Sequence, residues 1–316
     1  MASSTLCLAI LIPLIFFHNL HASSSFSLSV ENFKEEVIVS SPKPTFTVGF
    51  YAVGKNAFCF AVWYTHSPDT LVWIANRDQP VNGKRSTLSL LKTGNLVLTD
   101  AGQFQVWSTN TATASEQVRL HLHDSGNLVL LEDSSDNAVL WQSFDFPTDT
   151  LLPDQPLQGS TNLVSSRSGS NYSSGFYRLF FDFENVLRLM YKGPRVSSVF
   201  WPYAWLQSNN FGNGNGNGRS IFNDSRVVVM DDLGYLVSSD NFTFKTSDYG
   251  MRLLRRLTLD HDGNVRFYSM KDGEDKWSVS GLFRQQPCFI HGICGPNSIC
   301  SYEPRNGRKC SCSPGI

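Results

Sequence analysis

The chain has 316 residues, of which 41% are hydrophobic and 13% aromatic, enough apolar material for more than one packed core. This composition excludes a wholly disordered chain. The 26 Lys and Arg residues nearly balance the 27 Asp and Glu residues, leaving a formal net charge of -1. Because no strong positive field surrounds such a chain, nucleic acid is not an expected partner.

The N-terminal segment has the pattern of a secretory signal peptide. An apolar run from Leu6 to Phe17 precedes the small residues Ala22, Ser23 and Ser24, where a signal peptidase could cut. The first residues lack Lys and Arg, which leaves an uncleaved anchor or a core helix as the alternative. The run is shorter than the roughly 20 residues that span a bilayer, and no second long apolar run follows. We predict a signal peptide over residues 1–24 and a secreted chain, or the outer face of the plasma membrane if the chain is a fragment of a receptor.

Beyond the signal, short apolar runs alternate with polar residues. Examples are Phe46 to Tyr51, Phe58 to Tyr64, Leu71 to Ala75 and Leu88 to Thr99. Gly, Asn, Asp and Pro punctuate these runs, and no alternation of strands with helices is visible. The pattern predicts an all-β fold, either a sandwich, a barrel or a prism.

A turn followed by a strand recurs along the chain. The segment 91–99 (LKTGNLVLT) returns as 123–131 (HDSGNLVLL), and looser copies start at Phe183, Asp232 and Asp260. Two copies before residue 150 and three after it predict two related domains, over residues 25–156 and 176–285. The Ser- and Gly-rich stretch 157–175 is the expected linker.

Three Asn-x-Ser/Thr sequons predict N-glycosylation at Asn171, Asn223 and Asn241. The Gly-Asn tract 212–218 does not fit a phosphate-binding G-x-G-x-x-G loop, so a surface loop is expected there.

Three stretches carry a family resemblance: Val72 to Val81 (VWIANRDQPV), the paired GNLVL repeats, and Leu140 to Pro153 (LWQSFDFPTDTLLP). Together they resemble the bulb-type lectin domain of plant S-domain receptor-like kinases. Phe181 to Pro202 resembles their S-locus glycoprotein region, in the subgroup typified by the maize receptor-like protein kinase. The resemblance implies tandem β-prism domains, each with three small sheets about a pseudo-threefold axis. The receptors continue into a PAN-type module, a membrane helix and a cytoplasmic Ser/Thr kinase, none of which this sequence contains.

In the mannose-binding relatives each sheet carries Q-x-D-x-N-x-V-x-Y. Alternate strand residues face one side, so three polar side chains can grip sugar hydroxyls beside an apolar Val. The first repeat keeps Asn95 and Val97, and the second keeps Asn127 and Val129. Each lost hydrogen bond removes about 1 kcal/mol, so mannose binding at these two candidates is doubtful. The alternative is that Asn holds the turn and Val packs between the sheets.

The last repeat keeps more of the pattern. Asp262, Asn264 and Tyr268 match it, and Asp260 stands where Gln would be. A carbohydrate site and a structural role are both open for these residues.

Five cysteines lie in the last thirty residues: Cys288, Cys294, Cys300, Cys310 and Cys312. No C-x-x-C knuckle is present, and an exported chain favours disulfides over zinc. The spacing resembles an EGF-like module, which implies bridges Cys288–Cys300 and Cys294–Cys310 within residues 286–316. That module would be incomplete, since Cys312 lacks a partner. Cys59 is expected to pack as a buried thiol.

The remaining chemistry-bearing residues have mainly structural interpretations. Core packing is expected for Trp63, Trp73, Trp107 and Trp141, and Trp201 and Trp205 are left open. His121 and His123 lack a third metal ligand and fit a surface strand. Arg252, Arg255 and Arg256 suggest a solvated strand edge, with an acidic glycan or partner as the alternative.

No nucleophile-elbow, zinc-protease, Walker or protein-kinase motif occurs, so neither an enzyme nor a cofactor or metal is predicted. The expected function is extracellular recognition of a glycan or glycoprotein. The alternatives are a protein-interaction ectodomain that forms a homodimer or binds a receptor partner without sugar, and a secreted cell-wall glycoprotein.

Overall fold

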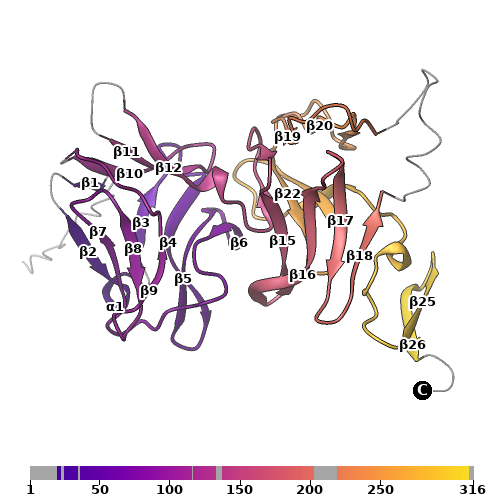
Figure 1. The fold of residues 1–316 in the computed structure, drawn as a ribbon, viewed down its shortest axis with the longest axis horizontal. Helices are drawn as coiled ribbons and strands as arrows, with labels where there is room; N and C mark the ends of the chain where they lie inside the picture. The colour runs from indigo at the N-terminus through magenta and orange to yellow at the C-terminus, as the bar shows by residue number, and fades with distance from the viewer. Residues whose placement is uncertain are drawn as a thin grey trace, which may run out of the picture.

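The structure is a computed structural model that describes residues 20–22, 25–34, 36–115, 117–132, 137–202 and 219–312. The apolar run of the predicted signal peptide, Trp205 and the Gly-Asn tract lie outside these residues. Two β-rich units lie side by side, and a small module follows the second unit at the C-terminal end (Figure 1).

The first unit consists of three four-stranded antiparallel sheets. One sheet is a continuous meander of β3 (Val37–Ser40), β4 (Phe46–Gly54), β5 (Ala57–Tyr64) and β6 (Ser67–Ile74). In the second sheet β2 (Phe26–Ser29) joins β7 (Thr87–Leu90), β8 (Leu96–Thr99) and β9 (Gln105–Ser108). In the third sheet β1 (Leu20–Ala22) joins β10 (Val118–Leu122), β11 (Leu128–Glu132) and β12 (Val139–Gln142). The short helices α1 (Val30–Phe33) and η1 (Ser143–Asp145) connect strands.

The second unit repeats this topology strand for strand. Its meander is β15 (Asn162–Ser168), β16 (Asn171–Phe181), β17 (Leu187–Lys192) and β18 (Ser197–Trp201). In its second sheet β14 (Leu157–Gln158) joins β19 (Val227–Met230), β20 (Tyr235–Ser238) and β21 (Thr243–Lys245). In its third sheet β13 (Thr150–Leu151) joins β22 (Leu254–Leu259), β23 (Val265–Met270) and β24 (Ser278–Leu282). The predicted tandem of β-prism domains is therefore confirmed, and one fold is used twice.

The recurring sequence pattern corresponds to one kind of hairpin turn. In the first copy Gly94 N–H donates to the Leu91 carbonyl, and Leu91 N–H donates to the Asn95 carbonyl, each at 2.9 Å. A left-handed residue closes each of the five recognised turns: Gly94, Gly126, Asn185, Gly234 and Gly263. Such turns need a positive φ, which Gly and Asn adopt at low cost. The sixth hairpin, between β4 and β5, turns at Asn56 with φ 55°, but no GNLVL pattern marks it in the sequence.

Each unit closes its core with three aromatic rings, one from each sheet. In the first unit these are Trp73, Trp107 and Trp141, with ring centroids 5.8, 5.6 and 5.6 Å apart. The rings in the second unit are Trp201, Phe242 and Phe283, at 4.9, 4.8 and 5.1 Å. Trp73, Trp141 and Trp201 are buried, while Trp63 and Trp107 are half-buried. The expected core role of the tryptophans in the first unit is thus confirmed for Trp73 and Trp141.

The two units are joined by the Asn-Arg-Asp sequence that carries part of the family resemblance. Arg77 donates to three backbone carbonyls of the second unit, those of Val164 (2.8 Å), Ser165 (3.2 Å) and Tyr172 (2.8 Å). Asp78 accepts hydrogen bonds from the Ser174 N–H and hydroxyl, both at 2.6 Å. Hydrogen bonds to charged groups are stronger than neutral ones, so this short segment fixes one unit against the other.

The expected linker 157–175 is wrong, because it contains β14, β15 and the start of β16. Leu163 and Ser165 are both fully buried, so the Ser-rich stretch is a strand whose alternate side chains face the core. The boundary also moves. β13 starts at Thr150 and pairs with β22, so the second unit (residues 150–285) begins before the predicted end of the first domain.

The expected solvated edge at Arg252, Arg255 and Arg256 is wrong for Arg255, which is only 2% exposed. Its guanidinium donates to the Asp248 carboxylate at 2.6 Å, to two hydroxyls and to three backbone carbonyls. A buried guanidinium needs such partners, because an unpaired buried charge is very unfavourable. Sequence alone does not reveal these partners, which come from a loop and from β23.

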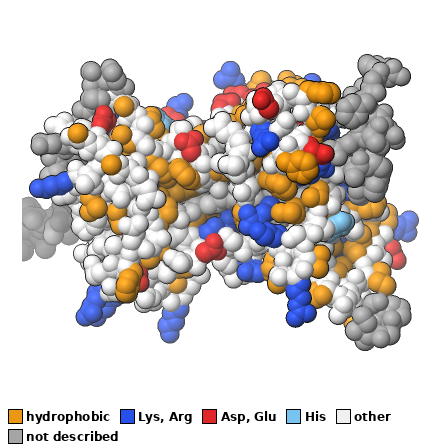
Figure 2. All heavy atoms as spheres, viewed as in Figure 1, with side chains coloured by type: hydrophobic (Ala, Val, Ile, Leu, Met, Phe, Trp, Pro, Cys, Tyr) orange, Lys and Arg blue, Asp and Glu red, His pale blue; other side chains and the backbone are white. Residues whose placement is uncertain are grey.

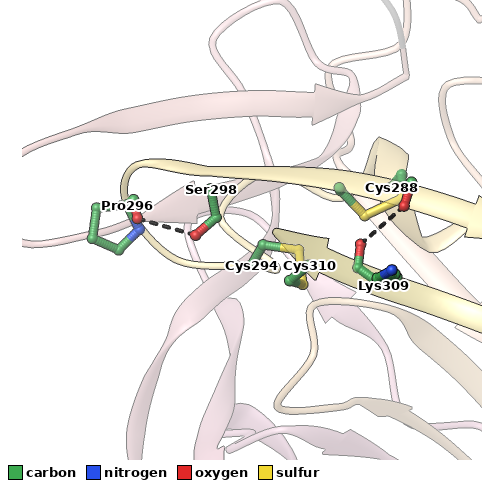
Figure 3. The surroundings of a disulfide bond; sticks show 8 residues. Cys288, Cys294, Pro296, Ser298, Lys309 and Cys310 are labelled. Carbon is green, nitrogen blue, oxygen red and sulfur yellow. Dashed lines mark hydrogen bonds between the residues drawn. A yellow bond between two sulfur atoms is a disulfide. The ribbon is translucent and has the colours of Figure 1, made fainter. Parts of the chain in front are cut away.

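The disulfide module (residues 286–312) contains η2 (Pro287–Phe289), β25 (Ser298–Glu303) and β26 (Gly307–Cys312). Disulfides join Cys288 to Cys300 and Cys294 to Cys310, the pairing that the EGF-like resemblance implies. Figure 3 shows the second bridge fastening the loop before β25 to β26. Ile290, 2% exposed, packs into the core of the second unit and so anchors the module to it.

Two further cysteines within the described residues, Cys59 and Cys312, are free. Cys59 is fully buried, and its thiol lies 3.6 Å from the Asn76 carbonyl. Burial raises its pKa to about 12, which makes the reactive thiolate rare. Cys312 is exposed.

Candidate glycan-binding sites

Asn95 and Asn127, the candidates in the first unit, fasten their turns to the chain beyond the next strand. Asn95 Oδ1 accepts a hydrogen bond from the Thr109 hydroxyl at 3.0 Å. Asn127 donates to Gln142 Oε1 at 2.9 Å and accepts from the Ser143 hydroxyl at 3.3 Å. Their side-chain oxygens are therefore engaged inside the protein, as a turn-holding role requires.

The valines that accompany them are also buried. Val97 is 6% exposed and Val129 is 1% exposed. Neither can offer an apolar patch to a sugar ring without a change in packing. The core between the sheets is filled by their strand neighbours Leu96, Leu98, Leu128 and Leu130, so the two valines lie on the opposite faces of their sheets.

Asn264 plays the same fastening role in the second unit. It is 3% exposed, its Nδ2 donates to the Arg284 carbonyl at 2.7 Å, and its Oδ1 accepts from Arg284 N–H at 3.0 Å. The side chain thus pairs with a backbone unit as a neighbouring strand would. A sugar could use this amide only by displacing both hydrogen bonds.

Asp262 and Asp260 are held by Arg266, which stands where the mannose-binding pattern has Val. The guanidinium of Arg266 binds Asp262 through two hydrogen bonds of 2.9 and 2.7 Å, and Asp260 through one of 2.7 Å. Burial opposes ionisation of Asp262, but the hydrogen bonds and charge of Arg266 outweigh it and hold the pKa of this carboxyl below its usual value. Arg266 thus occupies the hydrogen-bonding groups that a sugar would need.

Tyr268 completes this cluster at its other end. Its hydroxyl donates to Asp260 at 2.8 Å, and the guanidinium of Arg256 lies 3.9 Å from its ring centroid. Burial, with the charge of Asp260, raises the pKa of Tyr268, so the phenol remains a neutral donor. Tyr268 therefore holds Asp260 and Arg256 in place.

Beyond this cluster a polar cavity of about 200 Å³ opens between the two units. Carboxylates, hydroxyls and one guanidinium form most of its lining: Asp69, Asp149, Thr150, Arg256, Thr258 and Asp260. Figure 2 shows Lys and Arg side chains gathered on the second unit near this junction. The sequence placed Asp260 near a site but gave no sign that it would meet residues of the first unit.

Arg256 has spare hydrogen-bonding capacity in this cavity. It donates to the Thr258 hydroxyl at 2.6 Å and lies between the rings of Tyr268 and Trp277, the latter 4.9 Å away. Its Nε is buried and, among the described residues, has no hydrogen-bond acceptor. Burial lowers the pKa of Arg256. Such a buried donor is closed to solvent, so the part of Arg256 that lines the cavity, and not this Nε, is available to a ligand.

Asp149 is the main acidic group on the opposite wall. Its side chain is 15% exposed, its nearest cation is Arg77 at 3.6 Å, and the Thr150 hydroxyl donates to it at 3.0 Å. Burial raises the pKa of Asp149 despite that cation. The sequence carried Asp149 only as part of the family motif 140–153, and no local signal assigned it a role.

The structure also describes the predicted glycosylation sites and the pair of histidines. The sequon residues Asn171, Asn223 and Asn241 are all exposed in the structure. The rings of His121 and His123 are 4.7 Å apart, and no group of three potential metal ligands occurs in the described part of the chain. No helix among the described residues is long and apolar enough to cross a membrane.

Two family models match the sequence. The D-mannose binding lectin model matches residues 70–171, and the S-locus glycoprotein domain model matches residues 224–316. A Zea mays protein named "Putative receptor protein kinase" is 44% identical over 92% of this chain. A G-type lectin S-receptor-like serine/threonine-protein kinase of Arabidopsis thaliana is 29% identical over 95% of it. The chain spans 35% and 36% of these two relatives, which is their ectodomain part, and it contains no kinase domain.

Solved lectin structures also resemble the chain. A monomeric monocot mannose-binding lectin from Gastrodia elata is 20% identical, covers 40% of this chain over 96% of its own length, and gives a TM-score of 0.28. The two-domain fetuin-binding agglutinin of Scilla campanulata is 16% identical, covers 79% of this chain over 90% of its own length, and gives a TM-score of 0.23.

Proposed function

We infer that the chain belongs to the G-type lectin S-receptor-like kinases, because models of a mannose-binding lectin domain and an S-locus glycoprotein domain match it, and on this premise we propose that it binds a glycan in the polar cavity between its two units. It is an extracellular recognition module without catalytic activity of its own. The ligand is an uncharged sugar residue at the end of a glycan or a glycoprotein side chain.

The polar lining that both units give this cavity carries this proposal. Sugar hydroxyls both donate and accept hydrogen bonds, so a sugar site needs both kinds of partner. The guanidinium of Arg256 supplies a donor group, Asp69 supplies an acceptor from the first unit, and Asp149 supplies another beside β13. A cavity of about 200 Å³ is smaller than most ligand pockets, which supports recognition of one sugar ring rather than of an extended chain.

The charges around the cavity support a neutral ligand. Arg266 pairs with Asp260, and Arg77 is the closest cation to Asp149. Arg256 and Asp69 then remain as one positive and one negative group. A ligand with a net charge would leave one of these unmatched in a partly dry site, whereas a polyhydroxyl ligand can satisfy both.

A glycan array with the purified chain, followed by calorimetry on the best ligand, tests this proposal. Arg256→Lys keeps the charge but loses the planar fork, so the affinity should fall at least about tenfold. Arg252→Lys is the matched control, because Arg252 is exposed and lies outside the cavity. The proposal fails if no glycan binds, or if both variants bind as wild type does. Binding lost in Asp262→Ala but kept in Arg256→Lys would place the site at the late repeat instead.

A separate observation, two exposed aromatic side chains, favours a protein-binding role without sugar. Phe183 and Phe222 are 86% and 81% exposed, and Asn185 and Arg226 bond to backbone beside them, which keeps both rings on one side of the second unit. Exposed aromatic residues of this kind are enriched at interfaces. If this apolar pair mediates dimerisation, sedimentation will show a dimer that Phe183→Ser with Phe222→Ser converts to monomer. A wild-type monomer at high concentration would remove the dimer version.

A further inference from the structure

A second and larger cavity lies between the second unit and the disulfide module. Its volume is about 740 Å³, within the range of about 300–1,000 Å³ of small-molecule sites. Apolar and aromatic side chains form most of its wall: Phe176, Tyr177, Tyr191, Val196, Ile293 and Pro296. The turn 260–263 separates the two cavities, since His261 lines both of them.

The aromatic wall is built to keep its shape. Tyr191 lies 5.9 Å from Phe176 and 5.5 Å from Tyr177, measured between ring centroids. Two glycines allow the chain to approach these rings closely. A Cβ on Gly292 would come within 2.5 Å of Tyr191, and one on Gly263 within 2.5 Å of Tyr177. Both glycines also have a positive φ, at 74° and 83°, so other residues are doubly disfavoured there.

The disulfide module completes the cavity and fixes the opposite wall. The bridges at Cys288 and Cys294 hold the loop that carries Gly292, Ile293 and Pro296 (Figure 3). This wall is also tied to the second unit, because His291 Nδ1 lies 2.9 Å from the Ser198 hydroxyl. The cavity thus exists before any ligand arrives, which lowers the entropic cost of binding.

Positive charge at this cavity is not compensated. Arg195 and Arg308 both line it, and neither has a carboxylate partner within the described residues. The acidic group in the lining, Asp262, is already bound by two hydrogen bonds to Arg266. An apolar interior with free guanidinium groups fits a ligand that is apolar at one end and anionic at the other.

We propose that this cavity binds a small aromatic carboxylate. The ring of the ligand lies among Phe176, Tyr177 and Tyr191, because aromatic rings gain from offset or edge contacts beyond simple burial. Its carboxylate lies at Arg195 or Arg308, where a guanidinium donates charge-assisted hydrogen bonds. This binding site differs from the proposed glycan site in place, polarity and charge, so each can exist without the other.

Three molecules of similar shape and different charge test this proposal. They are 3-phenylpropionate, the neutral 3-phenylpropanol and the cationic 3-phenylpropylamine, titrated into the secreted full chain by calorimetry and by ligand-observed NMR. We expect the carboxylate to bind at least about tenfold more tightly than the alcohol and the amine not to bind, since a charged hydrogen bond contributes more than a neutral one. Hexanoate, which has the charge without the ring, should bind more weakly than 3-phenylpropionate.

Variants then assign the binding to this cavity. Arg195→Gln with Arg308→Gln should reduce the affinity for 3-phenylpropionate to that of the alcohol and leave the alcohol unchanged. Arg305→Gln is the control, because it removes an exposed Arg from the same module outside the cavity. Unaltered thermal unfolding of the double variant shows that the fold is intact. The proposal is overturned if 3-phenylpropionate does not bind at millimolar concentrations, if the alcohol binds equally well, or if the double variant binds the acid as wild type does.

Discussion

The two β-prism units share one topology but are stabilised by different chemistry. The core of the first unit is closed by Trp73, Trp107 and Trp141, and among the described residues its ion pairing is limited to the 3.6 Å contact of Arg77 with Asp149. The second unit has a smaller aromatic cluster and most of the chain's ion pairs, including Arg219 with the fully buried Asp240. In both units the strands satisfy the backbone hydrogen bonds by pairing with one another. The side chains that stabilise the unit can then be either packed aromatic rings or paired charges.

The two units also differ in how much of the two cavities they line. Paired charges leave polar groups near the surface of the second unit, and both cavities are lined largely by that unit. The first unit contributes a rigid partner through Arg77 and Asp78. Four predictions test the contrast between the two units.

The largest expected effect comes from opening the aromatic cluster of the first unit. Trp73→Ala should lower the free energy of unfolding by about 3–5 kcal/mol, because it leaves a cavity between three sheets. The substitution also removes the hydrogen bond from Trp73 Nε1 to the Phe146 carbonyl. Urea unfolding followed by fluorescence measures the loss. Trp63→Ala, at a half-buried ring outside the cluster, should cost clearly less, and equal costs would refute a special role for the cluster.

In the second unit the corresponding weak point is a charge. Asp240→Asn should lower the free energy of unfolding by about 2–4 kcal/mol, because Arg219 stays buried without its counter-ion. Replacing both partners with Asp240→Asn and Arg219→Met should restore much of the loss, since an apolar side chain needs no partner. If the double variant is less stable than the single one, stacking of Arg219 on Trp201 and Phe242 matters more than the ion pair.

The fastening asparagines should have a moderate and similar effect in both units. Asn127→Ala and Asn264→Ala each remove two or three hydrogen bonds, so we expect a loss of about 1–3 kcal/mol in stability. Glycan binding by the folded variants should be unchanged. Loss of sugar binding with full stability would show instead that these residues contact the ligand.

The smallest effect is the response to acid, for which the structure gives a direction. The pKa values of Asp248 and Asp262 are lowered in the folded chain, since their Arg partners outweigh burial. Their contribution to stability is therefore present above the usual carboxyl pKa of 3.8 and is lost as the pH falls through the lower, folded-state pKa. Asp149 acts oppositely, because burial raises its pKa, so that ionising this carboxyl reduces the stability of the folded chain.

Urea unfolding between neutral pH and about pH 3 measures this response. Asp262→Asn should flatten the acid loss of stability, while Asp149→Asn should steepen it because the opposing gain disappears. Identical slopes for the two variants would contradict these assignments.

Sequence patterns predicted the repeated hairpins well, because each GNLVL segment contains both the turn residues and the alternating side chains of the strand that follows. They did not mark the turn at Asn56, which also has a positive φ but joins β4 to β5 through a shorter loop without the GNLVL pattern. They also mistook 157–175 for a linker, since Ser165 is buried in a strand although Ser is polar. Of the candidate residues, Asp262 lines the larger cavity, but the sequence could not show that Arg266 already binds Asp262 and that Arg284 already binds Asn264.

The sequence by itself determined the all-β class, its duplication and the cysteine-rich C-terminal module, because turns, strand periodicity and cysteine spacing are local properties of a chain. The choice of a β-prism came from the family resemblance. Only the tertiary structure decided where the second unit begins, which polar groups are occupied and where cavities form. Those features depend on contacts between residues far apart in sequence, such as Thr150 with Thr258 and Arg77 with Val164. A local pattern cannot encode whether a donor such as Arg256 Nε finds a partner, since that depends on every element packed around it.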